Sequence, residues 1–197
     1  FAHFLQYGLK LTERAEYEFR AMDMGNIMHK VLESLIKEVN KEKLSLAELS
    51  EEERDALADR LVDEISADYG NTILKSSARN EYMIQRTKRM VRRTVWAIQK
   101  QLKSGEFEPE GVEVVFQGGR IDRVDTMETD DGKLYVRVID YKTGNTSFDL
   151  VSLYHGLQLQ LMIYMDGALT VEQNKHKDKD VIPAGVFYYN IKDPMIQ

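Results

Sequence analysis

The spacing of apolar residues predicts three helices in the first half of the chain. Across residues 12–40, apolar side chains recur three or four positions apart and mark one buried helix face. Ser50 followed by Glu53 has the pattern of a capping box, which predicts a second helix ending near Asp68. A third helix is expected over residues 77–102, because a Ser-Gly stop signal follows it.

The pattern changes after Pro109, where apolar and polar residues begin to alternate. Alternation rich in β-branched and aromatic residues predicts strands, and a later return to helical spacing predicts one more helix. A Thr-Asp-Asp-Gly sequence between the second and third strands is a turn signal. We expect strands over residues 112–116, 119–128 and 133–142, a helix over 150–169, a charged loop over 173–180 and a final strand over 183–190.

This order of elements predicts an α/β fold with a mixed sheet flanked by helices and an N-terminal helical region. We expect a single domain over residues 1–197. It divides into a helical part, residues 1–105, and a sheet part, residues 106–197.

Two aspartates on the predicted hairpin are expected to be cross-strand neighbours. A tight turn at residues 131–132 makes the numbers of paired residues add to about 263, and a turn at 130–131 makes them add to about 261. The numbers of Asp122 and Asp140 add to 262. Opposed Cβ atoms lie about 4.5–5.5 Å apart, and two like charges there are destabilising unless a cation lies between them. A divalent ion held by both carboxylates is the simplest such cation.

Lys142 lies two residues after Asp140 and therefore points to the same face of its strand. A lysine ammonium beside a carboxylate-bound metal stabilises charge on a phosphate or orients an attacking water. Tyr141 points to the other face, where its ring packs, although its backbone carbonyl is able to reach the ion. Taken alone, the Asp-Tyr-Lys segment is also explained by a surface ion pair on an edge strand.

Three polar residues on predicted helices are further candidates. His29 follows Gly25 by one turn, and a helical glycine costs about 1 kcal/mol against alanine, so close approach of another backbone or of DNA would explain it. A structural role, which is more common than metal binding for a lone helical histidine, also explains His29. Gln160 and Tyr164 share one face of an otherwise apolar helix. Packing alone explains the tyrosine, whereas a contact with DNA or with the metal ligands explains both.

Composition narrows the chemistry further. The chain has no cysteine, which excludes disulfides and thiolate-bound metals within it and leaves oxygen and imidazole as metal ligands. Carboxylate-rich sets of this kind suit Mg²⁺ or Mn²⁺. No apolar run reaches about 18 residues, so no membrane partner is expected and a cytoplasmic location is the default.

The net charge of −6 argues against a protein that coats nucleic acid through its overall charge, but it leaves room for a local basic surface. Acidic residues concentrate in 42–68, and residues 79–103 are basic. The basic stretch is explained either by a soluble helix surface or by a phosphate-binding stripe. The candidate DNA contacts are three arginines of this stretch and two that flank Asp122: Arg86, Arg89, Arg93, Arg120 and Arg123. Exposure to solvent alone also explains the two that flank Asp122.

Four short segments together resemble the RecB-like branch of the PD-(D/E)xK nucleases: GNIMH (25–29), GRIDRVD (119–125), VIDYKTG (138–144) and QLMIY (160–164). The order α-β-β-β-α-β also fits the restriction-endonuclease-like core of that family. Two longer segments resemble the C-terminal nuclease domain in the B subunit of AddAB-type ATP-dependent helicase–nucleases: FAHFLQYGLKL (1–11) and DLVSLYHGLQLQLMIYMDGAL (149–169). The resemblance covers most of the chain, and residues 42–68 are the least matched.

The resemblance implies a role for each matched position. The implied metal ligands are His29, Asp122, Asp140 and the carbonyl of Tyr141. The implied catalytic set is Asp122, Asp140 and Lys142, with Gln160 and Tyr164 as an accessory motif. In that family the B subunit works with a helicase–nuclease A subunit on broken duplex DNA ends, and its nuclease cuts an unwound single strand during recombinational repair.

The family also has a cysteine-bound iron–sulfur cluster whose ligands flank this domain. The chain is expected to begin just past the first of these cysteines and to end before the others, and so to be a fragment of a longer protein. No cluster and no ATP site are therefore expected within it.

We therefore expect a Mg²⁺- or Mn²⁺-dependent DNA exonuclease domain that hydrolyses unwound single-stranded DNA. The alternative is a non-catalytic DNA-binding or subunit-assembly module with the same fold, which the basic stretch 79–103 motivates. The Asp-Asp-Lys set argues against that alternative, because a scaffold has no need of such costly charge pairing. A third possibility is a stand-alone 5′-acting exonuclease of the same superfamily, which the match over 149–169 makes less favoured.

Overall fold

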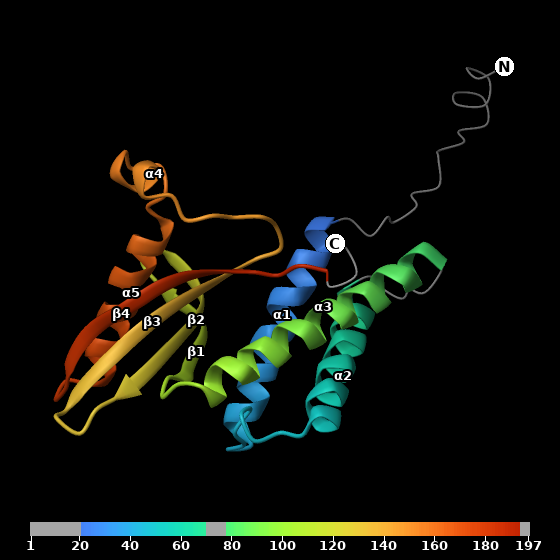
Figure 1. The fold of residues 1–197 in the computed structure, drawn as a ribbon, viewed down its shortest axis with the longest axis horizontal. Helices are drawn as coiled ribbons and strands as arrows, with labels where there is room; N and C mark the ends of the chain where they lie inside the picture. Colours follow the sequence, from blue (N-terminus) through green and yellow to red (C-terminus); the bar gives the residue numbers. More distant parts are fainter. Residues whose placement is uncertain (1–20, 70–77, 194–197) are drawn as a thin grey trace, which may run out of the picture.

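Three long helices form the first part of the structure, a computed structural model that describes residues 21–69 and 78–193. They lie side by side as a bundle next to the sheet (Figure 1): α1 Ala21–Lys41, α2 Glu51–Tyr69 and α3 Ala78–Lys103. The expected starts of the first and third helices, at residues 12 and 77, fall outside the described residues. At the start of α2, Glu53 Oε2 accepts from the Ser50 N–H at 3.0 Å and Ser50 Oγ accepts from the Glu53 N–H at 3.2 Å. The predicted capping box is therefore confirmed.

The second part is a sheet of β1 Glu108–Phe116, β2 Gly119–Glu128, β3 Lys133–Lys142 and β4 Asp180–Asn190, in that spatial order. β1, β2 and β3 pair antiparallel, and β4 joins β3 in parallel after a helical crossover. The predicted mixed sheet is confirmed. The first and last strands begin earlier than expected, and Pro109 is accommodated at a register irregularity on the edge strand β1.

The two faces of β3 belong to different hydrophobic cores. Ile139 and Tyr141 belong to the core that the three helices of the bundle build. Val136 and Val138 belong to a second core, which includes buried residues of α5 Gln160–Lys175. The sheet thus lies between the bundle and α5, as a restriction-endonuclease-like core with flanking helices requires (Figure 1). Among the described residues, no helix is both long enough and apolar enough to cross a membrane.

The hairpin of β2 and β3 has a register that, continued by one residue beyond its last pair, places Asp122 opposite Asp140. Arg123 pairs with Ile139 and Glu128 pairs with Leu134, so paired numbers add to 262. The turn lies between the two considered from sequence, because the Thr129 N–H donates to Lys133 O across a loop of residues 130–132. Gly132 closes the loop at φ 78°, a left-handed conformation that glycine adopts without strain.

The single helix expected over residues 150–169 is wrong. The structure has a short helix, α4 Leu150–Tyr154, followed by a separate α5 that extends to Lys175 and so takes in part of the expected loop. A Schellman motif separates them: Gly156 adopts φ 73°, its N–H donates to Leu153 O, and the next N–H donates to Ser152 O. The apolar periodicity runs through this break, which only the glycine marks.

Gly167, buried in α5, offers a test of how tightly α5 packs on the hairpin of β1 and β2. A Cβ at this position would lie 2.4 Å from Cδ2 of Phe116. We predict that Gly167→Ala lowers the free energy of unfolding by about 1–3 kcal/mol through overpacking, although alanine favours a helix by about 1 kcal/mol. Urea denaturation of Gly167→Ala in the wild-type and Phe116→Leu backgrounds measures this. Equal effects in both backgrounds would rule out the clash.

Candidate metal-dependent active site

A cleft of about 740 Å³ lies where α1, the three antiparallel strands and α5 meet. It brings together side chains that are far apart in the sequence. The predicted residues that line it are His29, Arg120, Asp122, Asp140, Tyr141, Lys142, Gln160 and Tyr164. The cleft also contains Glu113, which sequence reasoning missed.

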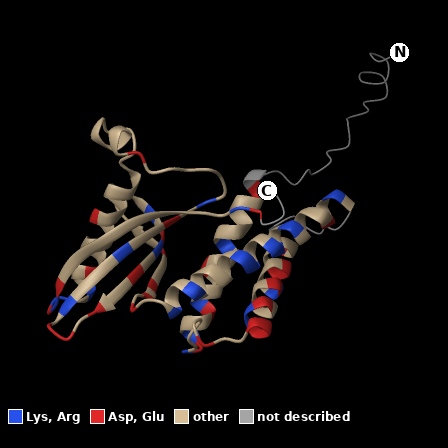
Figure 2. Ribbon diagram, viewed as in Figure 1, with Lys and Arg blue, Asp and Glu red and all other residues tan. Residues whose placement is uncertain are grey.

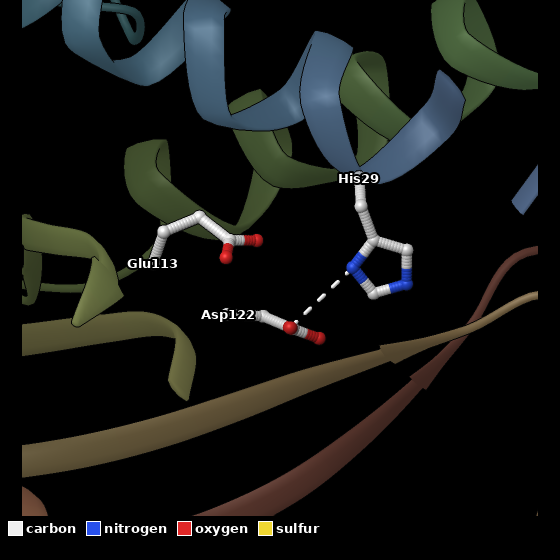
Figure 3. A group of neighbouring side chains, drawn as sticks. All are labelled: His29, Glu113 and Asp122. Carbon is white, nitrogen blue, oxygen red and sulfur yellow. Dashed lines mark ion pairs between the residues drawn. The ribbon is translucent and has the colours of Figure 1, made fainter. Parts of the chain in front are cut away.

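His29 extends from α1 toward the sheet, and the side chains of Asp122 and Glu113 extend toward the His29 ring (Figure 3). His29 Nδ1 lies 3.4 Å from Asp122 Oδ1, and this hydrogen bond raises the pKa of His29 above its ordinary value of 6.5. One ligand atom from each of the three residues lies within 4.8 Å of the others. An imidazole nitrogen and two carboxylate oxygens at this separation form a donor set that fits one divalent ion.

Glu113 sits on β1 between Val112 and Val114, which pair with Arg123 and Ile121. This register puts Glu113 across from Asp122. Its φ of 51° lies in the left-handed region, which a residue with a Cβ adopts only when its surroundings impose it. Burial raises the pKa of the Glu113 carboxyl, while the ion pair with Arg120 opposes that rise. Backbone strain and a partly desolvated carboxylate together mark a position shaped by the cleft.

Asp140 and Lys142 lie on the same face of β3, and Lys142 Nζ is 2.6 Å from Asp140 Oδ2. Burial raises the pKa of Asp140, and the nearby charge of Asp122 adds to that rise, whereas the hydrogen bond from Lys142 lowers it. Lys142 Nζ also lies 3.4 Å from Gln160 Oε1, and Gln160 Nε2 donates to the Tyr164 hydroxyl at 2.9 Å. The accessory pair therefore connects to the lysine rather than standing apart from it.

Side chains that alternate with the cleft residues along β2 and β3 point to the other face of the hairpin, where they form a buried network. Arg123 is fully buried, and its Nε and Nη2 donate to the two oxygens of Asp125 at 2.5 and 2.6 Å. Its Nη1 donates to the Tyr141 hydroxyl at 3.1 Å, and Arg137 Nη2 donates to Asp125 at 2.5 Å. The prediction that Arg123 binds DNA is wrong, because its guanidinium has no exposed surface with which to meet a phosphate.

Tyr141 connects this network to the cleft. Its ring is buried as expected, and its backbone N–H donates to Asp122 Oδ2 at 2.7 Å. That bond fixes one carboxylate oxygen of Asp122, so the other faces His29. Ligation of a metal by the Tyr141 carbonyl stays a prediction.

The other predicted DNA-binding arginines are partly engaged within the chain. Arg86 Nε donates to Asp193 Oδ2 at 2.7 Å, Arg89 lies 6.0 Å from the centre of the Tyr82 ring, and Arg93 lies 4.3 Å from that of Trp96. Basic residues of α3 also pair with acidic residues of α2, as in Lys88 with Asp63 at 2.7 Å (Figure 2). The α3 charge is thus partly neutralised, whereas Arg120 is exposed beside the cleft.

Comparison with known proteins identifies the family. A sequence model of the PD-(D/E)XK nuclease superfamily matches residues 1–197. The chain belongs to this superfamily. The resemblance stated from the four motifs is therefore confirmed, and the cleft lies where the motifs of this PD-(D/E)XK domain converge.

Three relatives of this PD-(D/E)XK domain share its whole length. Each is named as the B subunit of an ATP-dependent helicase/deoxyribonuclease, and they come from Lachnoclostridium phytofermentans, Alkaliphilus metalliredigens and Caldanaerobacter subterraneus, with identities of 46%, 36% and 38%. All of the chain is covered in each comparison, but only 18%, 19% and 18% of the relatives' own lengths. The chain therefore spans less than a fifth of the curated relatives that it matches.

The protonation of His29 makes metal binding sensitive to pH. Its pKa is raised above 6.5, so a metal ion must displace a proton from it at and below that pH. We predict that the affinity for Mn²⁺ falls on acidification by up to about tenfold per pH unit below this pKa and levels off above it. In the metal-free protein, protonated His29 stabilises the fold through its bond to Asp122. This stabilisation is fully present below pH 6.5 and is lost as the pH rises through the raised pKa.

Calorimetric titration with Mn²⁺ between about pH 5.5 and 8.5 measures this dependence. His29→Asn should bind more weakly and lose the pH-dependent step that His29 causes, while His155→Asn, at an exposed position after α4, should keep it. An identical pH profile in His29→Asn would show that His29 is not a ligand.

The buried network predicts an unequal response of two arginines. Arg123→Met leaves Asp125 buried with only Arg137, which should lower the free energy of unfolding by about 3–5 kcal/mol. Tyr141→Phe removes one bond to a charged group and should lower it by about 1.5–3 kcal/mol. Arg120→Met removes a mostly exposed arginine that is paired with the partly buried Glu113, and should change it by no more than about 1 kcal/mol. Urea denaturation compares the three, and similar values for both arginines would contradict the assignment.

Proposed function

We propose that this chain is a divalent-metal-dependent deoxyribonuclease domain that hydrolyses phosphodiester bonds of single-stranded DNA. The convergence of His29, Asp122, Asp140 and Lys142 in one cleft, from separate elements of the fold, carries the proposal. Membership of the PD-(D/E)XK nuclease superfamily gives this cleft a hydrolytic role. Nucleolytic chemistry needs the acidic and basic groups that the cleft gathers.

His29, Asp122 and Asp140 would hold the metal, with the carbonyl of Tyr141, because all four residues line the cleft. Glu113 would hold or orient it as well, since its carboxylate lies within 4.8 Å of ligand atoms of His29 and Asp122. When bound, Mg²⁺ or Mn²⁺ supplies a Lewis acid for the scissile phosphate and lowers the pKa of a water that attacks it. Asp122 is oriented for this by the Tyr141 N–H. The carboxylates of Asp140 and Glu113 have raised pKa values because burial disfavours their charge, and a cation among them removes that disadvantage.

Lys142 is the positive side chain placed beside these carboxylates. Asp140 and Gln160 hold its ammonium at the mouth of the cleft, where it would stabilise negative charge on the phosphate or orient the water. Tyr164 fixes the Gln160 amide by accepting from it at 2.9 Å. Gln160 and Tyr164 therefore act by positioning Lys142 and the DNA strand.

The names of the relatives support the rest of the proposal. They describe a subunit of an ATP-dependent helicase/deoxyribonuclease, so this domain would receive a single strand unwound from a duplex DNA end. A partner A subunit would work with it in recombinational repair, since the relatives are B subunits several times longer than this chain. Arg120, exposed at the edge of the cleft, is the arginine best placed to meet the strand's phosphates.

Matched variants on the β2–β3 hairpin test this proposal. Asp140→Asn and Lys142→Ala should each reduce cleavage of single-stranded DNA in Mg²⁺ or Mn²⁺ by about 100-fold or more. The controls Asp131→Asn and Lys133→Ala alter the same residue types in an exposed ion pair at the far end of the hairpin, and should leave cleavage unchanged. The measurement is release of labelled nucleotides over time, with circular dichroism to confirm folding.

Two results would contradict the proposal. One is cleavage that needs no divalent ion, or that persists in both cleft variants. The other is salt-dependent DNA binding by a chain that holds no divalent ion in calorimetry, which would favour the non-catalytic DNA-binding or assembly module instead.

A further inference from the structure

A second group of ligand-type side chains lies at the opposite end of α5 from the cleft. Glu172 and His176 stand one helical turn apart at the C-terminal end of this helix, and Glu110 reaches them from β1. One ligand atom from each lies within 4.8 Å of the other two. Glu172 is eight residues beyond Tyr164, the nearer of the two α5 residues that line the cleft, which is about 12 Å along a helix that rises about 1.5 Å per residue. The group is therefore separate from the cleft.

Glu172 is the unusual member, because its side chain is fully buried. Its Oε1 accepts from Lys175 Nζ at 2.8 Å. Its Oε2 is buried and has no hydrogen-bond donor among the described residues, and His176 Nε2 is 3.6 Å away. A buried carboxylate oxygen without a donor is costly, and the negative end of the helix dipole adds to the cost here. A cation beside Glu172 Oε2 would therefore stabilise the site.

Lys175 marks where that charge is favoured. Its Nζ lies 2.8 Å from Glu172 Oε1 and 3.7 Å from Glu110 Oε1, so one ammonium is shared by two carboxylates. The lysine side chain is 42% exposed, and its flexible stem can move to solvent without disturbing the core. A metal ion between the carboxylates would take over its role and would also satisfy Glu172 Oε2.

We propose that Glu110, Glu172 and His176 bind a zinc ion that joins the end of α5 to β1. An imidazole and two carboxylates are ligands that Zn²⁺ accepts, with water completing a tetrahedral set. Residues four apart on a helix present both side chains to one ion, and Glu110 closes the set from β1. The zinc would stabilise the packing of α5 on the sheet. This site is independent of the proposed nuclease chemistry, which uses none of its residues.

Zinc titration of the metal-free chain in a His29→Ala/Asp122→Ala background tests the site, because that background removes ligands of the cleft. Calorimetry should show one equivalent of Zn²⁺ bound, and zinc should raise the melting temperature. His176→Asn and Glu172→Gln should each weaken the affinity by about tenfold or more. Lys175→Met should strengthen it, since the competing ammonium is gone.

The control is His155→Asn, which removes an imidazole of the same chain outside the group and should leave the zinc affinity unchanged. No zinc binding in the double-variant background would overturn the proposal, as would equal affinities in His176→Asn and His155→Asn. The partly exposed His176 keeps the test decisive if Glu172→Gln does not fold. Loss of nuclease activity has no bearing on the result, because binding is measured with the cleft already disabled.

Discussion

The buried bonds between Arg123, Asp125 and Tyr141 determine where the cleft residues can lie. They join β2 to β3 inside the core, on the face of the hairpin away from the cleft. Side chains of neighbouring strand residues point to opposite faces, so Arg123 in the buried network places Asp122 on the cleft face. In the same way, Tyr141 in the network places Asp140 and Lys142 on the cleft face. A register slip of one residue would expose the arginine and bury the aspartates. The network therefore specifies the register on which the cleft depends.

The two faces of the hairpin differ in how completely their carboxylate charges are compensated. On the buried face, the charge of Asp125 is matched by Arg123 and Arg137. On the cleft face, burial raises the pKa values of Glu113 and Asp140, and the cations there leave that rise uncancelled. A buried pair that is fully bonded serves structure, whereas incompletely compensated carboxylates at a partly open cleft indicate a ligand. The same distinction separates Glu172 from the other buried ions.

The sequence predicted the parts of the site that depend on local geometry. The Asp122–Asp140 pairing followed from the length of one turn, and the capping box at Ser50 from a four-residue pattern. Glu113 was within reach of the same reasoning: a two-residue turn at 117–118 pairs Phe116 with Gly119 and places Glu113 across from Asp122, as observed. It was missed because a glutamate in a short apolar run looks like an exposed strand residue.

Other features depend on packing that no local pattern contains. Arg123 was expected to bind DNA because it flanks Asp122 in the sequence. A charged residue is seldom fully buried, and only the combined presence of Asp125, Arg137 and Tyr141 allows it here. The break at Gly156 was missed because apolar spacing continues on both sides of it. In each case the deciding contact comes from another strand or from backbone conformation.

The position of His29 shows how the helical part completes the site. A Cβ on Gly25 would lie 3.3 Å from Thr143 Oγ1, so glycine allows α1 to approach the end of β3 closely. His29 follows one turn later on the same side of α1 and so faces the hairpin. The close approach at Gly25 therefore allows a helix of the bundle to bring His29 to the cleft. The imidazole therefore reaches the carboxylates of the hairpin only when α1 is packed against the end of β3.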